Sequence, residues 1–98
     1  MDLIALTREM NRFVEAKGWY APDSPRPQTP RNLAASLAIE AAEVLEHFQW
    51  AESPTPGVQD ELADVALYLL QLAHQLDIDL EAAILAKLDH NYARRWDG

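Results

Sequence analysis

AIEAAEV (residues 38–44) and DELADVA (residues 60–66) are the two stretches that decide the fold of this chain. In each, alanine and larger aliphatic residues surround two acids that lie three positions apart. That spacing places both acids of a pair on the same face of an α-helix. The four acids are Glu40, Glu43, Glu61 and Asp64.

The position of these acids relative to the apolar residues is unusual. Leu37, Glu40 and Val44 fall in one row along a helix, so Glu40 belongs to the stripe that should be buried. Glu61 begins a similar row, and Asp64 lies beside it. Carboxylates beside a helical core repel one another and resist loss of water unless a cation neutralises them. A hard divalent ion that prefers oxygen ligands, above all Mg²⁺, is the simplest such cation.

Length and composition limit the class of protein. The 98 residues predict a single domain over 1–98, and a chain of this length buries only about 60–65% of its unfolded surface. We therefore expect a homodimer or homotetramer. A net charge of −8 argues against binding a nucleic acid polymer, and the lack of cysteine excludes disulfides and thiolate metal sites. Without a signal peptide or an apolar stretch of about 18 residues, no membrane is involved and a cytoplasmic location is expected.

The rest of the sequence predicts an all-α fold, an antiparallel four-helix bundle completed by oligomerisation. Four prolines forbid a regular helix in WYAPDSPRPQTP (residues 19–30), and Asp77 and Asp79 offer N-caps for the last helix. Short connections make the last three helices antiparallel neighbours, which brings the two acidic pairs face to face. The helices are expected over about 2–17, from 30 or 31 to 50 or 51, over 58–76 and over 80–95.

Two other interpretations of the acids are weaker. Acids at helical spacing are usually a solvated face, but two pairs beside apolar stripes on adjacent helices favour a shared site. A di-iron bundle requires Glu-x-x-His on two helices, and the residues three positions before His47, His74 and His90 are not acidic. The histidines are expected to be exposed or helix-capping, and Glu46 to be peripheral.

EAAEVLEHFQW (residues 40–50) followed by DELADVALYLLQLA (residues 60–73) resembles the MazG-like nucleotide pyrophosphohydrolases, within them the small dCTP pyrophosphatase type. The family signature is ExxE, a variable spacer and ExxD, and the four acids fit it with a spacer of 17 residues (44–60). The likeness covers about residues 13–95. Further family-like positions are Trp19, PRNL (30–33), FQW (48–50), Tyr68 and KLDHNYARR (87–95).

The resemblance implies hydrolysis of (deoxy)nucleoside triphosphates between the α and β phosphates, giving a monophosphate and pyrophosphate, as house-cleaning of the nucleotide pool. It also implies an all-α dimer or tetramer with sites between subunits, and one or more Mg²⁺ ions per site, with Mn²⁺ as a substitute. The dCTP type has His-x-Pro-x-Asn ahead of the first acidic helix, where this chain has Gln28 in place of the histidine and a longer, proline-rich loop. Both departures lie where base contacts are expected, so a preference for cytosine is not predicted.

Roles follow for the acids and for the basic end of the chain. All four acids are candidate metal ligands, and Glu43 is the candidate catalytic base that orients or deprotonates water, a contribution of about 10²–10⁴-fold. Lys87, Asn91 and Arg94 share one helix face that suits phosphate oxygens, although Arg94 and Arg95 could instead complement the helix dipole. The candidate substrate-binding residues are Trp19, Asn32, Trp50, Tyr68, Lys87, Asn91, Arg94 and Arg95.

The aromatic candidates have a structural alternative. Trp19 and Trp50 lie at helix ends beside loops, where a flat ring could stack on a base or could simply close the end of the bundle. The resemblance favours stacking. Two alternative functions remain open for the whole chain: a non-enzymatic helical dimerisation or regulatory module with an acidic surface, and a hydrolase acting on a phosphoribosyl nucleotide.

Overall fold

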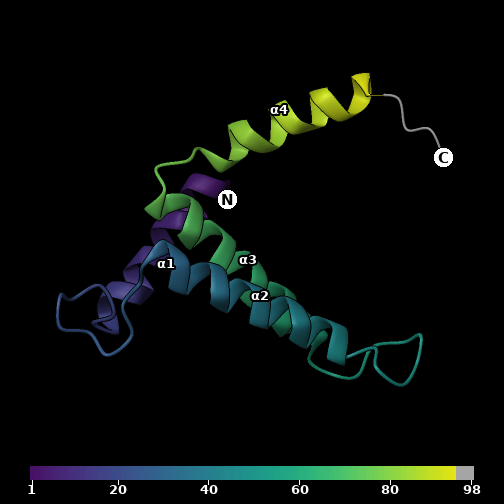
Figure 1. The fold of residues 1–98 in the computed structure, drawn as a ribbon, viewed down its shortest axis with the longest axis horizontal. Helices are drawn as coiled ribbons and strands as arrows, with labels where there is room; N and C mark the ends of the chain where they lie inside the picture. Colours follow the sequence, from purple (N-terminus) through teal and green to yellow (C-terminus); the bar gives the residue numbers. More distant parts are fainter. Residues whose placement is uncertain (95–98) are drawn as a thin grey trace.

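The computed structural model describes residues 1–94, and in that range it contains four α-helices and no β-strand (Figure 1). The all-α class and the number of helices agree with the sequence-based prediction. The helices are α1 (Leu3–Ala16), α2 (Pro30–Glu46), α3 (Val58–Gln75) and α4 (Leu80–Ala93).

Three of the helices begin at a capping side chain. Asp2, Thr29 and Asp79 each accept a hydrogen bond from a backbone N–H in the first turn of α1, α2 and α4, respectively. Pro30 occupies the first position of α2, where its missing N–H costs nothing. Asp77, the other expected cap of α4, instead adopts a left-handed conformation (φ 55°) just after α3.

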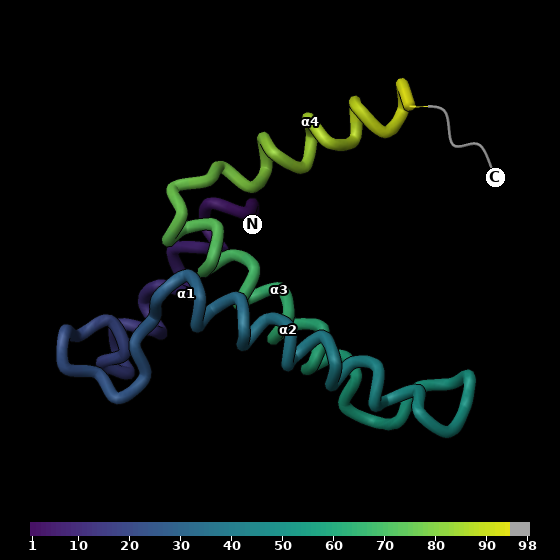
Figure 2. The backbone as a smooth tube through the Cα atoms, viewed as in Figure 1, coloured from purple at the N-terminus to yellow at the C-terminus, as the bar shows by residue number. Residues whose placement is uncertain are grey.

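The core lies where α3 packs against α2 on one side and α1 on the other. Figures 1 and 2 show α2 and α3 side by side and running in opposite directions, as expected from their short connection. This packing brings the acid-bearing turns of the two helices together. The buried side chains are few, which leaves much apolar surface exposed in the single chain: Met10, Val14, Leu33, Leu70, Gln71 and Ala73.

The second helix ends at Glu46, four or five residues earlier than predicted. Thr55 explains the difference, because its backbone N–H donates to the carbonyl of His47 at 2.8 Å and its hydroxyl lies 2.7 Å from Nδ1 of the same residue. These two contacts turn the chain back. Gly57 then begins α3 in a left-handed conformation (φ 96°) that other residues rarely adopt.

The fourth helix does not join a bundle within the single chain, contrary to the prediction that α3 and α4 are antiparallel neighbours. It extends away from the other three helices (Figure 1), and none of its described residues is buried. The chain turns after α3 through the left-handed Asp77, and the Ile78 N–H donates to the carbonyl of Ala73, so α4 leaves at an angle. No helix in the described part of the chain combines the length and apolar character needed to span a bilayer.

Candidate active site

The acidic residues of α2 and α3 form a compact cluster. One carboxylate oxygen from each of Glu40, Glu43 and Glu61 lies within 4.8 Å of the other two, and all three side chains are half-buried. The helical spacing aims both α2 acids towards α3, and the antiparallel packing supplies Glu61 from the opposite side. We call these three residues together with Asp64 the acidic cluster.

The acidic cluster lacks the groups that would satisfy its oxygens. Oε2 of Glu40 and Oε2 of Glu61 are both buried and have no hydrogen-bond partner among residues 1–94. Buried polar atoms are normally paired, so two orphaned carboxylate oxygens in one cluster need an explanation. Oxygen ligands of this kind suit a hard divalent cation, and the donor set therefore fits a metal ion.

Electrostatics in the acidic cluster lead to the same conclusion. Burial raises the pKa of Glu40 to about 7, from an ordinary value of 4.5. The neighbouring carboxylates of Glu61, Glu43 and Asp64 act in the same direction. A carboxylate whose neighbours are all acids is destabilised when charged, and a bound cation would reverse that effect.

The fourth acid lies at the edge of the cluster. Asp64 is half-buried one turn after Glu61, and it does not belong to the three-oxygen group. It borders a neighbouring cavity of about 370 Å³ together with Trp19 and Tyr68. On the other side of the cluster, Nε2 of His47 lies 3.9 Å from Oε1 of Glu61, so this helix-capping histidine also faces an acid.

Three candidate substrate-binding residues meet around one hollow. Trp19, Asn32 and Tyr68 all border a space of about 360 Å³ between the α1–α2 loop, the start of α2 and α3. Tyr68 lies one turn after Asp64 and borders both this hollow and the cavity next to Asp64. We call the space between Trp19, Asn32 and Tyr68 the aromatic pocket. It is thus connected to the acidic cluster through a single turn of α3.

Trp19 is held in a defined orientation. Its ring meets that of Phe13 edge-on, with 5.5 Å between ring centroids. The guanidinium of Arg26 lies 5.5 Å from the Trp19 centroid on the ring face, a favourable cation–π arrangement. Lys17 is placed in a similar way over Phe13, at 5.8 Å. These contacts fix one wall of the aromatic pocket and bring a positive charge to its rim.

The other substrate-binding candidates lie elsewhere in the single chain. Trp50 is 89% exposed in the α2–α3 loop, at the opposite end of α2 from the α1–α2 loop (Figure 1). Lys87, Asn91 and Arg94 lie on or directly after α4, which extends away from the acidic cluster. Arg95, the remaining candidate, falls outside the described residues.

Sequence reasoning missed several residues around these spaces. Arg26 and Ser36 border the aromatic pocket, and Gln71, which is buried, borders the cavity beside Asp64. The signal for Gln71 was present, since it is the one amide in an otherwise apolar stretch of α3, ALYLLQLA (residues 66–73). An amide in such a stretch is buried only where it finds a hydrogen-bond partner. No sequence pattern marked Arg26 or Ser36.

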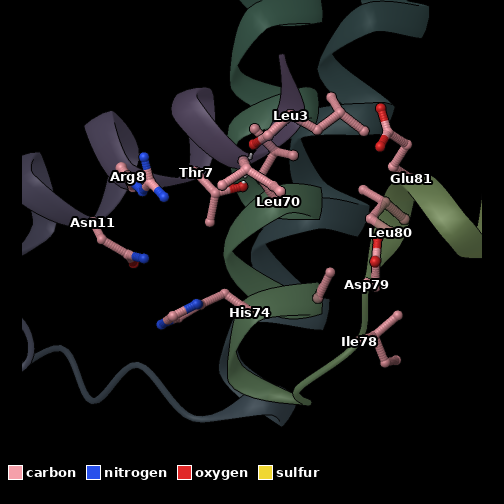
Figure 3. A pocket seen from close by; sticks show the side chains of 12 residues that line it. Leu3, Thr7, Arg8, Asn11, Leu70, His74, Ile78, Asp79, Leu80 and Glu81 are labelled. Atoms are coloured by element: carbon pink, nitrogen blue, oxygen red, sulfur yellow. Dashed lines mark hydrogen bonds between the residues drawn. The ribbon is translucent and has the colours of Figure 1, made fainter.

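A further hollow of about 350 Å³ lies at the junction of α1, α3 and the start of α4 (Figure 3). Arg8 and Asn11 of α1 face His74 of α3 across it, while Leu80 and Ile78 form its apolar side. None of the predicted site residues borders this hollow. The acidic cluster and the aromatic pocket are therefore the better candidates for an active site.

Comparison with known proteins agrees with the resemblance found in the sequence. The model of the MazG-like family matches residues 35–95, a range that contains all four acids. dCTP pyrophosphatase 1 of Homo sapiens is 40% identical over 76 residues, and that of Rattus norvegicus is 38% identical over 76 residues. Each match covers 66% of this chain and 45% of the relative, so the chain spans less than half the length of these proteins. With more than half of its sequence matched by the family model, the chain belongs to the MazG-like family.

Proposed function

We propose that the protein is a Mg²⁺-dependent nucleoside triphosphate pyrophosphohydrolase. It would cleave (deoxy)nucleoside triphosphates between the α and β phosphates, release a monophosphate and pyrophosphate, and so clear unwanted nucleotides from the pool. The relatives named dCTP pyrophosphatase 1 support this reaction class. The observation that carries the proposal is the group of three carboxylate oxygens within 4.8 Å, two of these side chains having orphaned buried oxygens.

The acidic cluster would hold the metal. Glu40, Glu43 and Glu61 would supply the main ligands, and Asp64 would complete the set from the next turn of α3. Bound Mg²⁺ supplies positive charge against the phosphate oxygens and makes water a stronger acid. The orphaned oxygens of Glu40 and Glu61 support this assignment, because a cation gives each of them a partner.

Glu43 would act on the attacking water. It is half-buried beside the other two glutamates, so its second oxygen could take the proton of a water molecule as that molecule attacks the phosphorus. The bond between phosphorus and the bridging oxygen then breaks, and pyrophosphate leaves with the electron pair. The reaction consumes one nucleoside triphosphate and one water and yields one monophosphate and one pyrophosphate, so it needs no other reactant.

The aromatic pocket would hold the base. Trp19 and Tyr68 offer ring surfaces, and a stacked base gains about 1–3 kcal/mol with little discrimination between bases. The amide nitrogen of Asn32 donates to the carbonyl of Pro27 at 2.9 Å, which fixes the side chain. Its carbonyl oxygen can then accept a hydrogen bond from a sugar or base. The pocket lies one turn of α3 away from Asp64, which is the direction in which the phosphates must extend.

Residues on α4 would complete the site from a second copy of the chain. Lys87, Asn91 and Arg94 lie on or directly after α4, which extends away from α2 and α3 in the single chain, so we expect them to reach phosphate oxygens in another subunit. Exposed apolar side chains on the same helix support such an assembly. Those with the largest exposed fractions are Tyr92 (89%), Leu85 (58%), Leu88 (47%) and Ile84 (43%).

The proposed activity has a direct test. The four dNTPs, the four NTPs and modified nucleotides are incubated with the protein, and pyrophosphate and monophosphate are measured with Mg²⁺, with Mn²⁺ and with EDTA. We expect metal-dependent release of both products in equal amounts. A helical interaction module would release neither, and its melting temperature would not rise with Mg²⁺ plus nucleotide, as ligand linkage requires of an enzyme.

A further inference from the structure

Gln71 is a polar side chain at the centre of the apolar core, with only 4% of its surface exposed. Its Nε2 donates to Oε1 of Gln28 at 2.6 Å and so joins α3 to the α1–α2 loop, 43 positions away in the sequence. Burying an amide is unfavourable unless it is hydrogen-bonded, so this bond is strongly preferred once the core has formed. We call the Gln28–Gln71 pair the amide latch.

The amide of Gln28 is engaged at both ends. While its oxygen accepts from Gln71, its Nε2 donates to the backbone carbonyl of Arg26 at 2.6 Å. Gln28 therefore holds the loop in a closed turn and ties that turn to α3. A side chain used in this way is directed at the protein and is poorly placed to distinguish one base from another.

A second anchor secures the beginning of the same loop. The Tyr20 hydroxyl donates to Oδ1 of Asn11 at 2.5 Å. Burial raises the pKa of Tyr20, and hydrogen bonds with the amides of Gln71 and Gln75 partly offset that rise. Gln71 thus contacts the loop near both of its ends, through Tyr20 and through Gln28.

The amide latch lies between the two spaces of the candidate site. Gln71 borders the cavity beside Asp64, and Gln28 borders the aromatic pocket. Trp19 and Tyr68 border both. Trp19 belongs to the loop and Tyr68 to α3, so the Gln28–Gln71 bond joins the two elements that carry these rings.

We propose that Gln71 is a positioning residue, which acts through Gln28 to hold the α1–α2 loop against α3 and so fixes the width of the aromatic pocket. This inference rests on the proposed function for the identity of the ligand. The amide latch controls affinity for all nucleotides alike, whereas the acidic cluster on α2 and α3 controls turnover. It follows that the latch sets how tightly the site binds and leaves the choice of base to other groups.

The first experiment compares Gln71→Leu, Gln28→Leu and the double variant in pyrophosphate release from several nucleotides. Each variant should raise KM about fivefold for every base, the effect of one lost hydrogen bond, with kcat within about twofold of the parent. The double variant should be no worse than either single variant, because both remove the same contact. Gln28→Glu keeps an acceptor oxygen for Gln71 but sets a second oxygen against the carbonyl of Arg26, so it should recover only part of the lost affinity.

Gln75→Leu is the matched control. It also removes an α3 amide that contacts Tyr20, but it leaves the amide latch intact.

The second experiment does not depend on activity. The other two tryptophans, Trp50 and Trp96, are replaced by Phe, and quenching of Trp19 fluorescence by acrylamide is measured. Gln71→Leu and Gln28→Leu should increase quenching, and Gln75→Leu should not. Gln28→Leu alters a residue outside the core, so it keeps the test decisive if Gln71→Leu fails to fold.

Three results would overturn the proposal for the amide latch. They are a change in KM confined to one base, a fall in kcat as large as the rise in KM, or unchanged Trp19 quenching in both latch variants. A change confined to one base in Gln28→Leu alone would mean that Gln28 contacts the base directly. If the parent protein releases no pyrophosphate while quenching responds as expected, the proposed function is wrong and the loop is still held by the latch.

Discussion

Glu43 is the residue on which the proposed chemistry depends most directly. In Glu43→Gln the side chain keeps its size and one oxygen but can no longer accept a proton. We expect pyrophosphate release to fall by about 10²–10⁴-fold, the usual contribution of a general base, while circular dichroism remains unchanged. Glu46→Gln, an exposed change three positions further along α2, is the matched control and should retain full activity. Parental activity in Glu43→Gln would remove Glu43 from the mechanism.

Glu40 makes the stability of the metal-free protein depend on pH. Its pKa is about 7 in the folded protein and 4.5 in the reference state, so the folded state binds more protons between these values. The free energy of unfolding should therefore decline as pH rises from about 4.5 to 7, and the stabilising contribution is fully present only below that range.

The expected decline is about 2 kcal/mol, because each pKa unit is worth about 1.4 kcal/mol and partial exposure reduces the total. Urea unfolding in EDTA at a series of pH values measures it. Glu40→Gln should flatten the profile, and Mg²⁺ should restore stability at high pH. A parent protein whose stability does not change over this range would show that Glu40 is not perturbed.

At the scale of single residues, the sequence predicted that the acids of the two helices face each other, and Glu40, Glu43 and Glu61 do so. Glu40 interrupts an apolar helix row, so its unusual position was visible in the sequence, while its role as a metal ligand stays a prediction. Gln28 was expected near the base, but its bond to Gln71 depends on how a proline-rich loop folds back onto α3, which no local pattern encodes. The half-buried position of His47 beside Glu61 was not visible in the sequence either. It depends on how the α2–α3 loop folds, because Thr55 of that loop contacts His47.

At the scale of elements, helix starts were easier to predict than helix ends. Asp2, Thr29 and Asp79 cap through contacts within three residues, so the sequence contains the whole interaction. The end of α2 at Glu46 depends instead on Thr55, nine positions away. The direction of α4 depends on the turn after α3, where Asp77 is left-handed and the Ile78 N–H donates to the carbonyl of Ala73, and this turn does not appear in the hydrophobic pattern.

The α4 helix has a testable role in substrate binding. If Lys87 contacts phosphate oxygens in an assembled site, Lys87→Ala should raise KM about 10–100-fold, the range expected for a charge-assisted hydrogen bond. Arg12→Ala, which removes an equal charge from the exposed side of α1, should change KM little. Steady-state kinetics over a range of salt concentrations measures both. A KM in Lys87→Ala equal to that of the parent would remove α4 from the phosphate site.

At the scale of the whole molecule, the six buried side chains among residues 1–94 form a small core. Assembly through α4 would bury additional apolar surface and bring its basic residues to a second acidic cluster. We expect light scattering to report the molar mass of a dimer or tetramer. Leu85→Glu should lower that mass towards the monomer value and abolish activity. Ala86→Glu adds the same charge on a different face of α4 and is the control. A parent protein that is both monomeric and active would contradict this arrangement.

The turn at Asp77 sets the direction in which the whole α4 helix extends. The fourteen residues of α4, at 1.5 Å each, make an arm about 21 Å long that follows a turn containing one non-glycine residue with positive φ, Asp77. A rotation of about 10° at that turn moves the far tip by about 4 Å, more than the length of a hydrogen bond. Small changes of torsion angle in the turn at Asp77 would therefore move the distal end of α4 by more than its side chains can adjust for in a hydrogen bond.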